Sequence, residues 1–403
     1  FSTTSLPSLR LASDERMQSM SFHQEHDALR ESANRFLIEQ CGFERHRQRQ
    51  QSADAGSNLA LWRQMAELGW LGITLGEPWG GMAQSPRAAL SLIEAMGAQF
   101  VPAPYAEALA ATHLLQLLGR PDQQATWLPR LCEGAALGLV AHVEPGARYE
   151  LDCVSTRADK VEQGFRLSGR KSAVPWGDAA DLLLVSARTG DAPGQRGDLS
   201  LFVVERSTAG LRFEGHAGIA DERWADVILD HVVVPQAALL GPAGEAQDAL
   251  DGTHAFLVAA DCAEAVGTMD AVLQETREYA STRKQFGTPL ARFQVIAHRL
   301  VDMFIQVQLA RSMAQLAASI VDDGPNTSAA RLRLAACKAQ ISHACRFVGE
   351  QAVQIHGGIG MTDELALSHR VRRLLAIDRR RGDQFHHLGT LAESVQQGVG
   401  LYA

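Results

Sequence analysis

The spacing of apolar residues changes twice along this chain, and that change limits the folds open to it. From residue 23 to about 134 the apolar positions recur at helical spacing, which predicts a bundle of short helices. From about 136 to 234, short runs of strand-forming residues alternate with Gly, Pro and Asp, which is typical of a compact antiparallel β domain. After Gly241-Pro242 the helical spacing returns and continues nearly to the end. The pattern therefore predicts an α+β multidomain protein.

The predicted boundaries give four parts. They are a tag or disordered extension (1–20), an N-terminal helical domain (21–135), a β domain (136–243) and a C-terminal helical domain (244–403). The last part contains predicted helices well above the usual dozen residues, which must either form a coiled coil or stack. The connections between them favour a four-helix bundle.

Composition narrows the class of protein. The chain is 46% hydrophobic and 21% charged, which is ordinary for a soluble globular protein. Its net charge of -8 argues against general nucleic-acid binding, which requires clustered positive charge. The six cysteines form no CxxC pair and no Cys/His cluster at metal-ligand spacing, so we expect reduced thiols, a cytoplasmic location and no metal site. No apolar run approaches the roughly 20 residues that span a bilayer.

Two short motifs near the C-terminus carry the functional signal. The first reads Arg-Lys-Gln-Phe-Gly over 283–287, and the second reads Gln-Ile-His-Gly-Gly-Ile-Gly over 354–360. Taken alone, each could simply end a helix, because basic residues and glycines are both common at helix C-termini. Together with the order of helices, β domain and helices, they resemble the flavin-binding signature of the acyl-CoA dehydrogenases. The resemblance covers essentially the whole chain from Phe22.

This resemblance implies the acyl-CoA dehydrogenase fold and the use of flavin adenine dinucleotide (FAD) to desaturate acyl-CoA thioesters. A ligand with two phosphates needs fixed cations and close backbone N–H groups, which an arginine fork and adjacent glycines can supply. The residues that the resemblance assigns to the adenine and pyrophosphate end of FAD are Arg283, Gln285, Phe286, Gln354, Gly357 and Gly358. In the family these residues serve a flavin whose reactive ring lies in the neighbouring subunit.

The segments that hold the flavin ring depart from the family pattern. Where the family has a Thr-Glu-Pro-Gly-Ala-Gly-Ser-Asp type of loop, residues 143–150 read Val-Glu-Pro-Gly-Ala-Arg-Tyr-Glu, so Val143 and Tyr149 replace two hydroxyl residues. Where the family has Trp-Ile-Thr-Asn-Gly, residues 173–177 read Ala-Val-Pro-Trp-Gly, and Pro175 has no N–H to donate. Several of the usual donors to the flavin ring are therefore missing.

The catalytic base also departs from the pattern. Removal of an α-proton requires a carboxylate, which the family places before a glycine about two dozen residues after the glycine motif. Here that position is Arg381, and arginine cannot accept a proton. The alternative position, on the helix before the first motif, is Leu257. Loss of a positioned base typically costs about 10²- to 10⁴-fold in rate.

Replacement carboxylates are available. Asp261 lies one helical turn beyond Leu257, so it shares that helix face in an apolar stretch and is the candidate base. Asp378 and Asp383 are further candidates. The alternatives for Asp261 are an ion pair with another helix or a subunit contact.

An arginine-rich stretch spans 370–381. It could contact CoA phosphates or an acidic acyl group, or form a solvated or interfacial helix face.

Within the family, the chain resembles the small-subunit type of bacterial acyl-CoA dehydrogenase, including the pimeloyl-CoA type and chains of steroid side-chain degradation. Supporting segments are 148–151, 263–267 and 293–295. The resemblance implies a second dehydrogenase-like subunit in an α2β2 heterotetramer, and an electron-transfer flavoprotein or similar acceptor. Three hypotheses follow: a base-lacking subunit that helps to hold its partner's flavin, a self-sufficient homo-oligomeric dehydrogenase that uses Asp261, or a non-catalytic assembly or acyl-CoA-binding protein without flavin.

Overall fold

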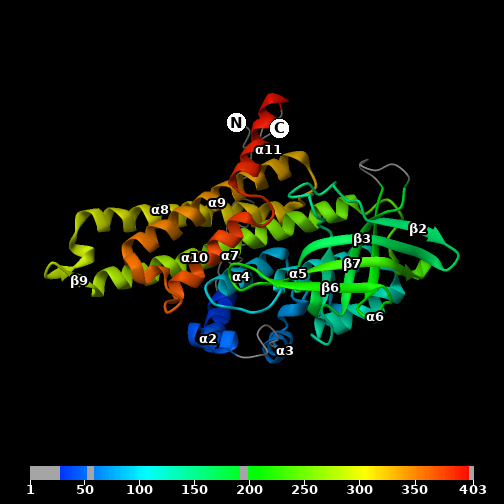
Figure 1. Cartoon of the computed structure of the whole chain (residues 1–403), viewed down its shortest axis with the longest axis horizontal. Coiled ribbons are helices and arrows are strands. Elements are labelled where there is room, and N and C mark those ends of the chain that lie inside the picture. Colours follow the sequence, from blue (N-terminus) through cyan, green and yellow to red (C-terminus); the bar gives the residue numbers. More distant parts are fainter. Residues whose placement is uncertain (1–27, 52–58, 191–197, 399–403) are drawn as a thin grey trace, which may run out of the picture.

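The computed structural model describes residues 28–51, 59–190 and 198–398, and shows three consecutive units (Figure 1). The predicted extension at 1–20 lies outside these residues. The first unit is helical. It contains a helix over 28–41, α2 (Phe43–Gln51), α3 (Leu59–Glu67), α4 (Pro86–Gly97), α5 (Tyr105–Leu118) and α6 (Pro121–Cys132), with 3-10 turns η1 (Trp70–Gly72) and η2 (Glu77–Trp79).

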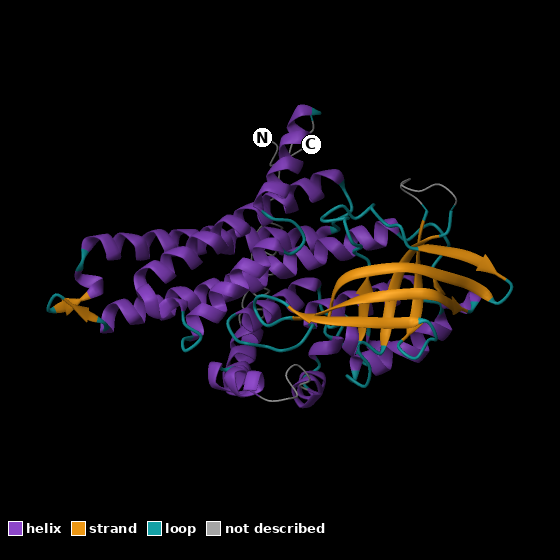
Figure 2. Ribbon diagram, in the orientation of Figure 1, coloured by secondary structure: helices purple, strands orange, loops and turns teal. Residues whose placement is uncertain are grey.

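The second unit is built on one twisted sheet, seen at the right of Figure 2. Its strands are β1 (Gly138–Ala141), β2 (Arg157–Val161), β3 (Gly164–Pro175), β4 (Leu182–Arg188), β5 (Leu199–Glu205), β6 (Leu211–Ala217), β7 (Arg223–Val234) and β8 (Leu239–Leu240), with turns η3 (Gly177–Ala179) and η4 (Gln236–Ala238). The order is β6-β7-β3-β2-β4-β5-β8, with β1 beside β4. Most pairs are antiparallel, as predicted, but β1 and β2 both pair with β4 in parallel.

The third unit is a bundle of long helices. It comprises α7 (Gln247–Thr282), α8 (Gln294–Asp323), α9 (Ser328–His356), α10 (Ala366–Arg379) and α11 (Gln384–Gln396), with a small hairpin of β9 (Lys284–Gln285) and β10 (Thr288–Pro289) and the turns η5 (Leu290–Arg292) and η6 (Gly357–Met361). In Figure 1 the hairpin forms the far tip of the bundle, and α11 projects away from it. The predicted fold class is confirmed: helices, a β domain and a helical bundle follow one another.

The first unit and the bundle share one hydrophobic core, to which α4, α7, α8, α9 and α10 all contribute. Glycines allow α4 and α7 to approach closely: a Cβ on Gly267 would clash with the carbonyl oxygen of Glu94, and one on Gly97 with that of Glu264. This approach buries the middle of α7 on several sides, which fixes the polar side chains there. No helix of the described residues is long and apolar enough to cross a membrane.

Candidate functional site

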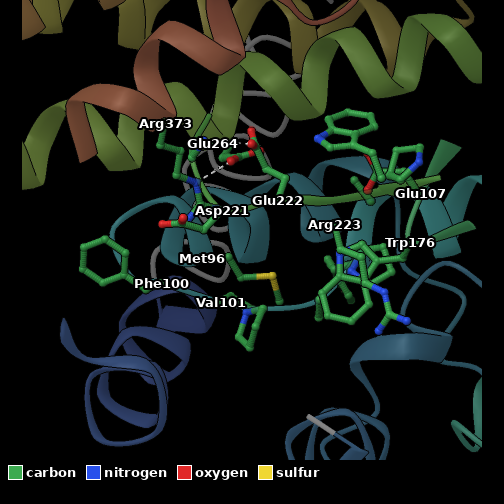
Figure 3. Close-up of a pocket in the computed structure, with 18 of the residues that line it drawn as sticks. Met96, Phe100, Val101, Glu107, Trp176, Asp221, Glu222, Arg223, Glu264 and Arg373 are labelled. Carbon is green, nitrogen blue, oxygen red and sulfur yellow. Dashed lines mark hydrogen bonds and ion pairs between the residues drawn. The ribbon is translucent and has the colours of Figure 1, made fainter. Parts of the chain in front are cut away.

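A cavity of about 850 Å³ lies where the three units meet. Its walls come from the α4–α5 connection, from the end of β3 with η3, from the β6–β7 turn, and from α7 and α10 (Figure 3). Apolar side chains such as Met96, Phe100 and Trp176 line part of it, whereas charged side chains cover the α7 side. Such a cleft between units, with convergent polar groups, is the best candidate for a ligand site.

Asp261 lies on the α7 wall, and arginines hold its carboxylate. The Arg381 guanidinium donates from Nη1 to Oδ1 at 2.7 Å and to Oδ2 at 2.8 Å. Arg380 Nε lies 3.3 Å from Oδ1. The side chain of Asp261 is only 2% exposed. Asp261 therefore forms an ion pair, which was one of its predicted alternatives. A base that must take a substrate proton needs a free lone pair aimed at that proton, whereas both oxygens of Asp261 accept from Arg381.

Three further charges complete this network. Arg381 Nη2 donates to Glu107 at 2.8 Å, and Glu264 accepts from Arg373 at 2.6 Å and from Arg380 at 2.7 Å. Burial raises the pKa of Glu264, but the two arginines outweigh this and lower the pKa to about 2. Three arginines face three carboxylates, so the network is neutral. This balanced arrangement is how a protein tolerates buried charge.

The other positions considered for the base place no free carboxylate on the cavity. Leu257, the alternative family position, does not line it. Asp378 is buried, with Arg379 Nε 3.6 Å from one carboxylate oxygen, and it does not line the cavity. Asp383 caps α11 by accepting from the backbone N–H of His386 at 2.9 Å. No sequence motif points to Glu107, because its partner Arg381 lies 274 positions away.

Most arginines of the arginine-rich stretch contact other parts of the chain. Arg373, Arg380 and Arg381 turn inward to the network. Arg370 is also buried, and its Nε donates to Glu275 at 2.9 Å. Arg379, by contrast, is 71% exposed. The stretch therefore supplies internal counter-charges to α7, rather than a solvated face.

The segment that would hold a flavin ring uses its N–H groups within the chain. The backbone of Ser172 donates to the carbonyl of Val143, that of Ala173 to Asp226 Oδ1, and that of Trp176 to the carbonyl of Arg223, each at 2.8 Å. Ser172 also donates its hydroxyl to Asp226. These donors are therefore not available to a ligand.

The polar groups of the loop after β1 are also hydrogen-bonded within the chain. Glu144 accepts from the buried Lys171 ammonium at 2.7 Å and from the backbone of Thr156 at 3.0 Å. Burial lowers the pKa of Lys171 to about 8, and Lys171 in turn outweighs burial to hold the pKa of Glu144 at about 2. Tyr149, at a lost hydroxyl position, packs against the ring of His386 with centroids 4.9 Å apart.

The two motifs of the predicted FAD tail site meet at the far tip of the bundle. Tyr279, one turn before Arg283, stacks on His356, the residue before Gly357, with ring centroids 4.2 Å apart. Helices α7 and α9 therefore end side by side, and their end residues come together although about seventy positions separate them.

This tip is open to solvent. Arg283 and Gln285 are exposed, and the Phe286 ring is 93% exposed although its backbone has φ 55°. Gly357 has φ 68°, and a Cβ on Gly357 or Gly358 would meet no atom within 4 Å. An exposed aromatic ring in a sparsely populated backbone conformation, beside open glycines and an exposed cation, fits a phosphate-bearing group held at a surface. Gln354 is exposed on the last turn of α9.

Comparison with known proteins decides the family. The N-terminal, middle and C-terminal domain models of acyl-CoA dehydrogenase match residues 23–135, 140–232 and 259–395. The sequence is 30% identical over 347 residues to the acryloyl-CoA reductase (NADH) of Anaerotignum propionicum, covering 83% of this chain and 86% of that protein. The chain belongs to the acyl-CoA dehydrogenase family.

Solved structures of acyl-CoA dehydrogenases share the fold. The Tcur3481-Tcur3483 steroid ACAD superposes with a TM-score of 0.82 and 26% identity, over 93% of this chain and 99% of the matched one. The ChsE4-ChsE5 complex from Mycobacterium tuberculosis superposes with a TM-score of 0.83 and 23% identity, over 92% and 97%. The predicted family resemblance is confirmed, and acyl-CoA dehydrogenases are oxidoreductases that use FAD.

The residues of this acyl-CoA dehydrogenase relative fit FAD unequally. The bundle tip offers a cation and open backbone that suit the adenine and pyrophosphate end. The segments predicted to hold the flavin ring use their N–H donors within the chain, and Arg381, at the position predicted for the base, forms an ion pair with Asp261. The residues at the bundle tip suit the adenine and pyrophosphate end of FAD, whereas in the segments predicted to hold its ring the N–H donors of Ala173 and Trp176 are not free.

Proposed function

We propose that this chain is the base-lacking subunit of a heteromeric, FAD-dependent acyl-CoA dehydrogenase. In this proposal the bundle tip holds the adenine and pyrophosphate end of a flavin whose ring lies in a second, dehydrogenase-like subunit, and that subunit supplies the base. The observation that supports the proposal is the Arg381–Asp261 pair: the arginine at the position predicted for the base binds both oxygens of the candidate carboxylate.

The roles at the tip follow from the chemistry of its residues. Arg283 would bind phosphate oxygens through its planar fork, and Gly357 and Gly358 would let the backbone approach them. Phe286 would pack against the adenine or the partner chain, which explains why so large a ring is 93% exposed. When bound, FAD supplies the hydride acceptor for desaturation, whereas this chain's own residues only bind and orient it.

The assembly is proposed on similar grounds. A structure of two named chains in complex, ChsE4-ChsE5, is among those that share this fold. By that analogy we propose an α2β2 arrangement, with an acyl-CoA as substrate and an electron-transfer flavoprotein or similar protein as acceptor. The acyl chain would be one handled in fatty acid or steroid catabolism.

The decisive experiment is to co-express the chain with the products of its neighbouring genes and to test whether a dehydrogenase-like protein co-purifies with it. Purified complex should contain one FAD per heterodimer, and anaerobic addition of an acyl-CoA should bleach its absorbance. The chain alone should be colourless. A yellow, active homotetramer with one flavin per chain would overturn the proposal.

Two variants distinguish the remaining hypotheses. If the chain were self-sufficient through Asp261, Asp261→Asn would abolish bleaching of the homo-oligomer. If it were a non-catalytic assembly or acyl-CoA-binding protein, the co-purified complex would carry no flavin that depends on Arg283. In the proposed heteromer, Arg283→Ala weakens flavin retention, whereas the partner's chemistry persists once excess FAD is added.

A further inference from the structure

A cluster of imidazole and carboxylate groups lies at the rim of the cavity, apart from the ion-pair network. His46 comes from α2, Asp221 from the β6–β7 turn and His369 from α10. One potential ligand atom from each residue lies within 4.8 Å of the other two. The three residues are 148 or more positions apart in sequence, so no spacing motif could have revealed them.

We infer that His46, Asp221 and His369 bind one divalent transition-metal cation of the zinc type at the cavity mouth. This inference does not depend on the flavin assignment. Two imidazoles with one carboxylate form a ligand set known from zinc sites that keep a fourth position open. Hard cations such as Mg²⁺ or Ca²⁺ prefer oxygen ligands and are not expected here.

The distances between the ligand atoms support this assignment. His46 Nε2 lies 3.3 Å from His369 Nδ1, and Asp221 Oδ2 lies 3.7 Å from His46 Nε2 and 3.6 Å from His369 Nδ1. Bonds of about 2.0–2.2 Å in tetrahedral geometry place neighbouring ligand atoms about 3.3–3.6 Å apart. The three atoms thus form nearly one face of a tetrahedron, and small side-chain shifts would complete it.

The surroundings hold the ligands in the required state. His369 Nε2 lies 3.2 Å from the carbonyl of Asp363, so its N–H points there and Nδ1 keeps its lone pair toward the cluster. Asp221 has φ 63°, a conformation that aspartate tolerates better than most residues. Gln50 donates to Asp221 Oδ2 at 2.6 Å.

One side chain competes with the metal. Arg372 Nη2 lies 2.9 Å from His369 Nδ1 and 3.9 Å from Asp221 Oδ2, close to the lone pairs that the cation would use. Its Nη1 also donates to Asp363 at 2.7 Å. Arg372 is one-third exposed and can turn toward solvent while it keeps this second contact. We therefore expect the cation to displace the guanidinium, and removal of Arg372 to tighten metal binding.

The test uses the full chain without a polyhistidine tag, freed of metal by a chelator and titrated with Zn²⁺ in a calorimeter. One Zn²⁺ should bind per chain. His46→Gln and Asp221→Asn should each weaken binding by at least about tenfold. His298→Gln, which changes an exposed histidine on α8, should leave it unchanged. Arg372→Gln should increase the affinity, a gain that a purely structural histidine cluster would not show.

Co²⁺ gives an independent readout, because visible absorption reports its coordination by imidazole. The band should appear in the wild type, grow in Arg372→Gln and disappear in Asp221→Asn. Asp221 lies on an exposed turn, so this variant tests the site even if His46→Gln fails to fold. The inference is overturned if neither the wild type nor Arg372→Gln binds Zn²⁺, or if binding persists unchanged in Asp221→Asn.

Discussion

The arginines beside the middle of α7 are paired with carboxylates, whereas the arginine after its C-terminal end is exposed. At the middle, Arg380 and Arg381 are only 16% and 15% exposed and bind Asp261 and Glu264, so each charge has a partner within the chain. About 33 Å further along the helix, by its rise of 1.5 Å per residue, the side chain of Arg283 is exposed and forms no ion pair with the described residues. The buried region is electrostatically complete, whereas the exposed one is suited to a ligand from outside. A complete ion-pair network cannot also serve as a poised catalytic base.

The largest expected effect comes from disrupting the ion-pair network around Asp261. Asp261→Asn leaves Arg380 and Arg381 buried with less negative charge, and loss of one partner from a buried pair typically costs about 3–5 kcal/mol of stability. Urea denaturation of the wild type and the variant measures this difference. Asp230→Asn is the matched control, because Asp230 pairs with Arg212 on an exposed surface and should show no measurable change.

A double replacement sharpens the same comparison. Asp261→Leu with Arg381→Met removes one charge of each sign and should recover most of the lost stability, since apolar residues often replace buried pairs well. If the single variant were as stable as the wild type, the network would not be the structural unit that its distances indicate.

The next effect concerns Arg283 at the exposed tip of the bundle. Arg283→Ala in the heteromeric complex should weaken FAD binding about 10- to 100-fold, which corresponds to the 1.5–3 kcal/mol typical of a hydrogen bond to a charged group. Fluorescence of released FAD measures the affinity. Arg277→Ala, which removes an exposed arginine upstream on the same helix, should have little effect. Equal losses in both variants would indicate general charge attraction instead of a specific contact.

The sequence predicted the fold well because its signals are local. The apolar period changes at about residue 136 and again after Gly241-Pro242, and a period needs only a dozen neighbouring residues to be visible. The family motifs at 283–287 and 354–360 are local as well. Their meeting at one end of the bundle follows from two helices that run in the same direction.

The candidate site was less predictable because its partners are far apart in sequence. The sequence showed Arg381 at the position predicted for the base and Asp261 in an apolar stretch, but it did not show that the two side chains bind each other. That pairing depends on how α10 lies across α7, which no spacing rule encodes. The same holds for Glu107 and for the cluster of His46, Asp221 and His369, whose members come from three separate units of the fold.

A smaller effect tests the burial of His387 beside the ion-pair network. His387 is buried, and its Nε2 donates to the carbonyl oxygen of Arg381 at 3.1 Å. Burial, with nearby Lys338, lowers the pKa of His387 from 6.5 to about 3. Because the folded pKa is lower than the unfolded one, stability is fully present above pH 6.5 and falls as pH drops toward 3. Between pH 7.5 and 5 the loss should be about 2 kcal/mol.

Urea midpoints at these two pH values measure the loss, and His387→Gln should flatten the difference. His231→Gln is the control, because that ring is exposed on the sheet. An unchanged pH slope in His387→Gln would place the titrating group elsewhere.

The last comparison separates backbone strain at Gly357 from ligand contact at Gly358, where the smallest effect is expected. A methyl group added at Gly357 or Gly358 would have no atom within 4 Å, so alanine meets no steric obstacle at either position. Gly357, however, has φ 68° and ψ -147°, a region that only glycine adopts readily, so Gly357→Ala should cost about 1–3 kcal/mol of stability. Gly358 lacks a left-handed φ, and Gly358→Ala should leave the urea midpoint unchanged.

If the backbone at the tip lies against phosphates, the Gly358→Ala methyl must still intrude between chain and ligand. FAD affinity of the heteromeric complex should then fall about tenfold, equivalent to ~1.4 kcal/mol, without any loss of stability. Gly389→Ala, a change with equally open surroundings on α11, should alter neither quantity. A Gly358→Ala complex that keeps full FAD affinity would show that these glycines only end a helix, and the open region would then need a different ligand.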